Sequence, residues 1–186
     1  MELKPDLRIG WLDGWLALVL LVLTEGILFL AFPKSVVVRL FDRSSWSQRQ
    51  RVLTVASKLC ALICLVLIAL TPLKVGSLVF VIGASLIALG LTGLVKALFD
   101  YKNAPLDEPA THGLYRVSRH PQIVMATLVL AGACMVIGSW LALAMLAAAR
   151  VFGHASIMVE EENCLKQYGD SYRDYLKRVP RYFVFF

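Results

Sequence analysis

Two polar clusters that could bind a charged ligand lie at the two ends of one long apolar segment. Arg119 and His120 stand directly before Pro121, and Glu160 and Glu161 stand at the far end. An arginine can hold a carboxylate through two parallel hydrogen bonds, and glutamates can hold an ammonium group or another cation. If the clusters meet, they can bind a zwitterionic ligand that carries a carboxylate and an amine. Ion pairs between a loop and a tail would use the same residues, so a structural contact is the alternative.

A third set of polar residues precedes the acidic cluster. At about 100° per residue, Arg150, His154 and Glu161 share one stripe of a helix. An arginine at membrane depth needs an anion or a carbonyl group nearby, which favours a polar wall facing a cavity. The alternative is an arginine that snorkels to the interface beside His154. Pro121 suits the first turn of a helix, where free backbone N–H groups favour negative charge.

The composition places these residues in a membrane protein. The chain has 186 residues, 59% of them hydrophobic and 17% charged, whereas soluble domains have about 25% charged residues. The mean hydropathy is +0.71. The net charge of +6 is therefore interpreted through the placement of loops, and we expect no nucleic-acid partner.

The length of the apolar segments predicts the number of spans. Three apolar regions, near residues 15–32, 53–70 and 77–99, can each cross a bilayer once. The stretch from Pro121 to Glu160 would be about 60 Å long as one helix, twice the hydrocarbon thickness, so it must cross twice. Residues 137–140 (Ile-Gly-Ser-Trp) offer the turn. We predict an all-α polytopic membrane protein with about five transmembrane helices, with three spans in residues 1–98 and a hairpin core in 99–186.

The distribution of basic residues predicts the orientation. The loop after the first span carries five basic residues against Asp42 alone, namely Lys34, Arg39, Arg43, Arg49 and Arg51. The loop after the second span carries only Lys74. Basic loops stay in the cytoplasm, so five spans place residues 100–120 and the tail from Glu160 on the cytoplasmic side.

Several residues within the spans are given structural roles. We predict that Glu25 and Lys58 pair between the first two spans, because charges at such depth find partners, and the alternative is a role in acceptor binding. A glycine stripe at Gly76, Gly83, Gly90 and Gly93 predicts close helix packing. The cysteines are expected to be packed thiols, and no metal site is predicted; they are Cys60, Cys64, Cys134 and Cys164.

An ordered set of motifs between residues 99 and 183 resembles the isoprenylcysteine carboxyl methyltransferase and phospholipid methyltransferase superfamily. The motifs are Gly113-Leu114-Tyr115-Arg116-x-x-Arg119-His120-Pro121, Glu160-Glu161, Tyr168-Gly169-x-x-Tyr172-x-x-Tyr175 and Arg178-Val179-Pro180. The family often continues Arg-His-Pro-x-Tyr-x-Gly, whereas here Pro121 is followed by Gln-Ile-Val-Met, which lacks both the tyrosine and the small residue.

The resemblance implies an integral-membrane enzyme that uses S-adenosylmethionine at a cytoplasmic site. Carried over by position, the cofactor residues are Gly113, Tyr115, Arg119, His120, Pro121, Glu160 and Glu161, and Arg178 lies near the reacting centre. We add His154 to the cofactor site and assign catalytic roles to Arg178, Glu161 and Arg150. Tyr172 and Tyr175 are expected to be anchors at the membrane interface.

Methyl transfer from a sulfonium is an in-line displacement that requires alignment and a dry pocket. An amine acceptor must lose a proton, for which Glu161 or His154 is a candidate. The expected partners are the bilayer and a lipophilic acceptor, which stays open among a prenylcysteine carboxylate, a phospholipid amine and a lipophilic thiol; no feature sets an oligomeric state. The alternatives are an NADPH-dependent sterol-type reductase and a non-enzymatic membrane scaffold or transporter.

Overall fold

The computed structural model describes residues 1–3, 5–8, 10–34, 36–37, 48–105 and 107–183. Within these residues the regular elements are helical, which confirms the all-α fold class. The elements are α1 (Trp15–Ala31), α3 (Gln48–Ala69), α4 (Leu78–Lys102), the 3-10 helix η1 (Gly113–Arg116), α5 (Pro121–Val136), α6 (Trp140–Tyr168) and α7 (Asp170–Arg178).

The apolar segment after Pro121 folds back on itself, as its length requires. α5 ends at Val136 and α6 begins at Trp140. Between them Gly138 has a φ of +65°, the left-handed conformation that ends helices and that glycine adopts without steric penalty. Ser139 then caps α6, because its Oγ accepts a hydrogen bond of 3.1 Å from the Ala142 N–H. The predicted hairpin turn is confirmed.

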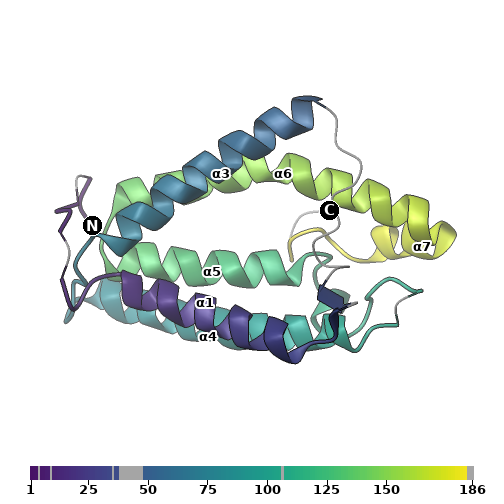
Figure 1. Ribbon diagram of the computed structural model, residues 1–186, viewed down its shortest axis with the longest axis horizontal. Coiled ribbons are helices and arrows are strands. Elements are labelled where there is room, and N and C mark those ends of the chain that lie inside the picture. Colours follow the sequence, from purple (N-terminus) through teal and green to yellow (C-terminus); the bar gives the residue numbers. More distant parts are fainter. Residues whose placement is uncertain (4, 9, 35, 38–47, 106, 184–186) are drawn as a thin grey trace.

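The helices form two layers that diverge along the molecule (Figure 1). α3 packs on α6 in one layer, and α4 packs on α5 in the other, where α1 lies beside α4. Gly83 and Gly132 let α4 and α5 approach closely, since a β-carbon on Gly83 would lie 2.8 Å from the Gly132 carbonyl oxygen. Gly90 and Gly93 also face α5, whereas Gly76 lies in open space before α4. The packing prediction is therefore confirmed for every member of the stripe except Gly76.

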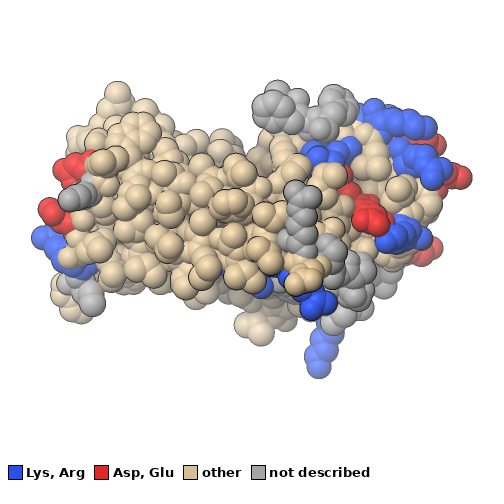
Figure 2. All heavy atoms as spheres, turned by 90° about the horizontal axis from the view of Figure 1, so that it is seen from above, with Lys and Arg blue, Asp and Glu red and all other residues tan. Residues whose placement is uncertain are grey.

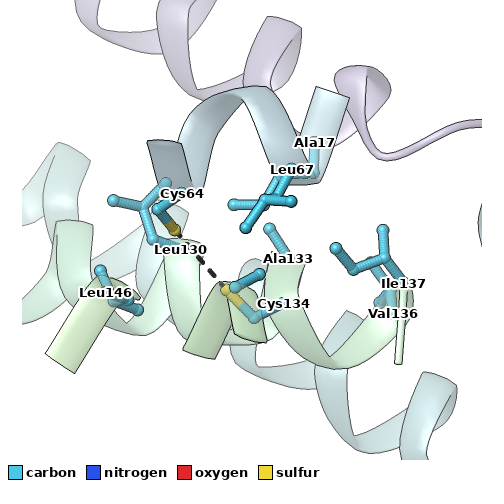
Figure 3. Close-up of a cluster of buried hydrophobic side chains, with 11 residues drawn as sticks. Ala17, Cys64, Leu67, Leu130, Ala133, Cys134, Val136, Ile137 and Leu146 are labelled. Atoms are coloured by element: carbon cyan, nitrogen blue, oxygen red, sulfur yellow. Dashed lines mark hydrogen bonds between the residues drawn. The ribbon is translucent and has the colours of Figure 1, made fainter. Parts of the chain in front are cut away.

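Apolar side chains join the two layers beside the hairpin turn, at what we call the closed end (Figure 3). Ile68 of α3, Ala133 of α5 and Ala142 of α6 are completely buried there. The Sγ atoms of Cys64 and Cys134 lie 3.9 Å apart as two thiols. This contact joins α3 to α5, so the cysteines at this end are packed thiols as predicted.

The layers separate toward the opposite end, which we call the open end. It holds the end of α4, the loop that contains η1, the last turns of α6 and α7 (Figure 1). Both polar clusters of the sequence lie here. On the face that Figure 2 shows, charged side chains gather at the two ends of the molecule, and the surface between them is mostly apolar. An ion pair between Glu2 and Lys74 marks the closed end, and pairs within α7 mark the open end.

This distribution is that of a protein embedded in a bilayer. α3, α4 and α6 are long and apolar enough to cross a membrane, which makes them candidate membrane spans, as predicted. α1 and α5 are apolar helices of 17 and 16 residues, and the count of five spans stays a prediction. Most of the basic loop, residues 38–47 with Arg39, Asp42 and Arg43, lies outside the described residues, and nothing is described of the Arg49 side chain.

The predicted ion pair between Glu25 and Lys58 is wrong. Within the described part of the chain, neither side chain forms an ion pair. The reason is the layered arrangement: Glu25 belongs to α1, in the layer with α4 and α5, whereas Lys58 of α3 lines a cavity between the two layers.

Candidate active site

The carboxylate of Glu161 is the centre of the open end. The residue is 6% exposed and accepts two hydrogen bonds from Arg181, of 3.0 Å from Nε to Oε1 and 2.7 Å from Nη2 to Oε2. The Nε of Arg119 lies 2.9 Å from Oε1, an ion pair without hydrogen-bond geometry. His120 Nε2 lies 3.2 Å from the same oxygen. The hairpin therefore brings the Arg-His loop and the acidic cluster into direct contact.

Arg119 ties the loop to the C-terminal segment. Its Nη1 donates to the carbonyl oxygens of Leu176 and Val179, at 2.9 and 3.1 Å, and its backbone N–H donates to the Pro180 carbonyl. The guanidinium thus contacts several protein groups, as in the structural alternative for Arg119. Arg119 also lines the smaller cavity described below, and its role in cofactor binding stays a prediction.

Arg181 was missed by the sequence reasoning, which placed Arg178 near the reacting centre. Arg178 is exposed, and its Nε donates to the Asp174 carbonyl oxygen within α7. Arg181 stands three residues later and reaches Glu161 instead. Hydrogen bonding to Glu161 raises the pKa of the Arg181 guanidinium, so it stays charged. The catalytic role of Arg178 stays a prediction.

Gly113 lets an aspartate approach the loop. Gly113 has a φ of +59°, and a β-carbon there would overlap the Asp100 carboxylate. That carboxylate accepts a 2.9 Å hydrogen bond from the Leu114 N–H and pairs with Lys96. The loop is therefore fixed to the end of α4, and Pro121 then begins α5. The close approach at Gly113 is made by a side chain of the protein.

A large cavity lies between the two layers. Its volume is about 860 Å³, and its walls come from α3, α5, α6 and Tyr182. The apolar wall includes Ile123, Val124, Leu128, Ala131 and Val151. The charged or polar groups include Lys58, Arg150, His154 and Glu160. The cavity reaches the surface of the helix bundle at Val151, which is 72% exposed. The predicted polar wall at Arg150 and His154 thus faces a cavity.

His154 links this cavity to the C-terminal segment. Its Nδ1 lies 2.9 Å from the hydroxyl oxygen of Tyr182. Burial raises the pKa of Tyr182, so the phenol stays protonated. The Nε of Arg150, on the same helix, is buried without a hydrogen-bond partner among the described residues.

A smaller, more aromatic cavity of about 470 Å³ lies on the other side of Glu160. Its lining includes Tyr115 and Tyr175, and the hydroxyl of Tyr175 donates to the Tyr115 carbonyl oxygen at 2.7 Å. Burial raises the pKa values of both tyrosines. Tyr172 and Tyr175 are only 5% and 3% exposed, so the prediction that they anchor the membrane interface is wrong: they pack on each other and line the cavity.

The two cavities share Glu160 and Asn163. The Glu160 carboxylate is largely exposed and lies 3.9 Å from His120 Nδ1. The predicted site residues Tyr115, Arg119, His120 and Glu160 therefore line the smaller cavity, and Arg150 and His154 line the larger one with Glu160. Glu161, between them, is held by the protein.

The departure from the Arg-His-Pro-x-Tyr-x-Gly pattern has a local explanation. Ile123 stands at the tyrosine position and lines the larger cavity. Met125 stands at the glycine position, and its side chain occupies the space where a β-carbon of Gly93 would lie. The larger side chain on α5 is thus accommodated by a glycine on α4.

Comparison with known proteins identifies the family. The model of the phospholipid methyltransferase family matches residues 66–171, more than half of the chain. The matched segment contains the hairpin, the Arg-His loop and the acidic cluster. No curated protein matches the sequence. This membrane protein therefore belongs to the phospholipid methyltransferase family.

Proposed function

We propose that the protein transfers a methyl group from S-adenosylmethionine to a lipophilic acceptor. The proposal rests on one observation above all: two cavities of different chemistry meet at Glu160 and Asn163. One is aromatic and polar, and the other has an apolar wall formed by membrane helices. A water-soluble donor and an apolar acceptor need two such compartments with a common boundary.

The smaller cavity suits the chemistry of the donor. S-adenosylmethionine carries a sulfonium, an ammonium, a carboxylate and an adenine ring, and tyrosine faces attract cations and stack on bases. Tyr115 and Tyr175 would supply these faces, Glu160 would hold the ammonium group, and Gln167 would bind polar atoms of the donor. A volume of about 470 Å³ lies in the usual range for small-molecule sites. When bound, the donor supplies a methyl group on a positively charged sulfur.

The protein's contribution is alignment and the exclusion of water. Correct alignment of two reactants can lower a barrier by about 7–11 kcal/mol. Glu161, held by Arg119 and Arg181, fixes α6 against the loop and the C-terminal segment. Ile123 and Leu128 give the acceptor side an apolar wall, which favours a reaction that neutralises charge. We assign Glu161 and Arg119 positioning roles.

His154 is the better candidate for a general base if the acceptor is an amine. Glu161 already accepts hydrogen bonds from Arg181 and contacts His120, which reduces its ability to take a proton. In the tautomer whose Nδ1–H donates to the Tyr182 oxygen, His154 Nε2 can accept a proton from the acceptor. A carboxylate or thiolate acceptor needs no base.

We place the open end in the cytoplasm. The basic residues Lys34 and Arg51 flank the loop between α1 and α3 at this end, and basic loops are retained on the cytoplasmic side. A water-soluble donor would enter from that side, and the acceptor would enter from the bilayer near Val151.

Titration calorimetry with S-adenosylmethionine tests the donor site. We expect binding to the wild-type protein and about 10-fold weaker binding to Glu160→Gln, which removes one charge-assisted contact. Glu162→Gln is the matched control, because Glu162 lines neither cavity and pairs with Lys166 on the surface. The absence of heat with wild type, or equal binding by Glu160→Gln, would count against the proposal.

A further inference from the structure

Two cations in the larger cavity have no anionic partner among the described residues. Lys58 of α3 and Arg150 of α6 both line it, and neither forms an ion pair within the part of the chain that the structure describes. The Arg150 Nε is buried and lacks a hydrogen-bond partner among the described residues. Charged groups in transmembrane helices normally pair with another group, so this arrangement requires an anion.

The two cations lie at the same level of the helix bundle. Ser57, next to Lys58, donates its hydroxyl hydrogen to the carbonyl oxygen of Ala149, next to Arg150, at 2.8 Å. The acidic group in the lining of this cavity is Glu160, ten residues along α6 from Arg150, or about 15 Å at the helical rise. The cavity thus has a positive region in the bilayer and an acidic group at its boundary with the aromatic cavity.

We infer that Arg150 and Lys58 bind the anionic group of an amphiphilic methyl acceptor, either a phosphodiester or a carboxylate. This inference rests on the proposed function and assigns the residues that would hold the acceptor's anionic group. A guanidinium can bind either anion through two hydrogen bonds, and a lysine adds a second charge. Leu128 and Ala131 line the same cavity and provide an apolar surface for the hydrocarbon chain.

The position of His154 agrees with this arrangement. His154 lies one turn from Arg150 in the direction of Glu160, about 6 Å along the helix axis. An anion held by Arg150 would therefore place the rest of the acceptor head group beside His154, toward the boundary with the donor cavity. The two cations would fix the acceptor's depth and orientation through its anionic group. An amphiphile without such a group should therefore bind less tightly.

Binding of three amphiphiles that share one oleoyl chain tests the inference without catalysis. Titration calorimetry in dodecyl maltoside would compare oleoyl-lysophosphatidylethanolamine, oleate and neutral mono-olein. We expect wild type to bind at least one of the two probes that carry an anionic group, the zwitterionic lysophospholipid or oleate, about 10- to 100-fold more tightly than mono-olein, the effect of one or two charge-assisted contacts. The probe that is preferred identifies the anion as a phosphodiester or a carboxylate. Equal binding of all three probes would overturn the inference.

Variants separate the cation site from general effects. Arg150→Gln and Lys58→Gln should each reduce the preference for the anion about 10-fold or more. Arg150→Lys should retain more of it than Arg150→Gln, because it keeps the charge and loses the second hydrogen bond. Arg173→Gln, at a surface pair of α7, should behave like wild type. Lys58 is exposed, so its variant tests the inference even if Arg150→Gln fails to fold. An unchanged preference in Lys58→Gln and in folded Arg150→Gln would contradict it. S-adenosylmethionine binding is measured in parallel. If the wild-type protein does not bind S-adenosylmethionine, the proposed function is refuted. If it binds S-adenosylmethionine but shows no preference for an anionic group, only this inference is refuted.

Discussion

The closed and open ends of the molecule are made from the same helices but use opposite kinds of contact. At the closed end, α3, α5 and α6 meet through small and apolar side chains such as Ala133, Cys134 and Ile68. At the open end, the same helices separate and enclose a cavity of about 860 Å³, and Glu161 with its arginines connects the loop, α6 and the C-terminal segment. Apolar packing thus sets where the hairpin turns, and charged contacts set the shape of the site.

This difference indicates where substitutions should act. Contacts at the closed end fix the helices in place, so their loss should reduce stability at any ligand concentration. Contacts at the open end position side chains around the cavities, so their loss should also change ligand binding. The following predictions test this separation.

The largest effect is expected for Glu161→Gln at the open end. The variant leaves Arg119 and Arg181 without their carboxylate in a buried position, and breaking such a buried pair costs about 3–5 kcal/mol. We expect a clear fall in the thermal unfolding temperature in detergent and loss of S-adenosylmethionine binding. The exposed neighbour provides the control: Glu162→Gln should change stability by less than about 1 kcal/mol. Similar stabilities for the two variants would show that the Glu161 cluster does not hold this end together.

An intermediate effect is expected for Gly83→Ala in the seam between α4 and α5. The new methyl group would lie 2.8 Å from the Gly132 carbonyl oxygen, and overpacking of this kind costs about 1–3 kcal/mol. Gly26→Ala in α1 is the matched control, because nothing lies within 4 Å of a β-carbon there and alanine is the better helix former by about 0.5–1 kcal/mol. Thermal unfolding should therefore shift down for the first and stay or rise for the second. A shift of the same sign in both would contradict the close packing of this seam.

The smallest effect is expected for Tyr175→Phe in the aromatic cavity. It removes the 2.7 Å hydrogen bond to the Tyr115 carbonyl oxygen, worth about 0.5–1.5 kcal/mol, and keeps the ring. We expect a slight loss of stability and a few-fold weaker binding of S-adenosylmethionine by titration calorimetry. Undiminished stability would indicate that the ring packing of Tyr175 is sufficient to order this wall.

The general design of the fold could be predicted from the sequence. Hydropathy and length required that the segment after Pro121 reverse near Gly138, and this reversal necessarily brings residues 119–120 near residues 160–161. These conclusions depend on the bilayer thickness and the helical rise, which apply to any chain. They did not need knowledge of individual side-chain contacts.

The individual partners could not be predicted in the same way. Whether Arg119 faces a ligand or the carbonyl groups of residues 176 and 179 depends on how the C-terminal segment returns to the loop, which has no periodic signal. The same return path brings Arg181 and not Arg178 to Glu161. The separation of α1 from the cavity likewise left Glu25 and Lys58 apart, because the assignment of helices to layers is not encoded in hydropathy.

The most direct test of the proposed function is methyl transfer by the purified protein in lipid vesicles. S-adenosylmethionine with a labelled methyl group would be incubated with membrane lipid extract and, separately, with a farnesylcysteine analogue. We expect label in an organic-soluble product, strongly reduced in Glu160→Gln and unchanged in Glu162→Gln. Binding of S-adenosylmethionine without transfer of label to any lipophilic acceptor, or equal transfer by Glu160→Gln, would contradict a reaction at the boundary of the two cavities.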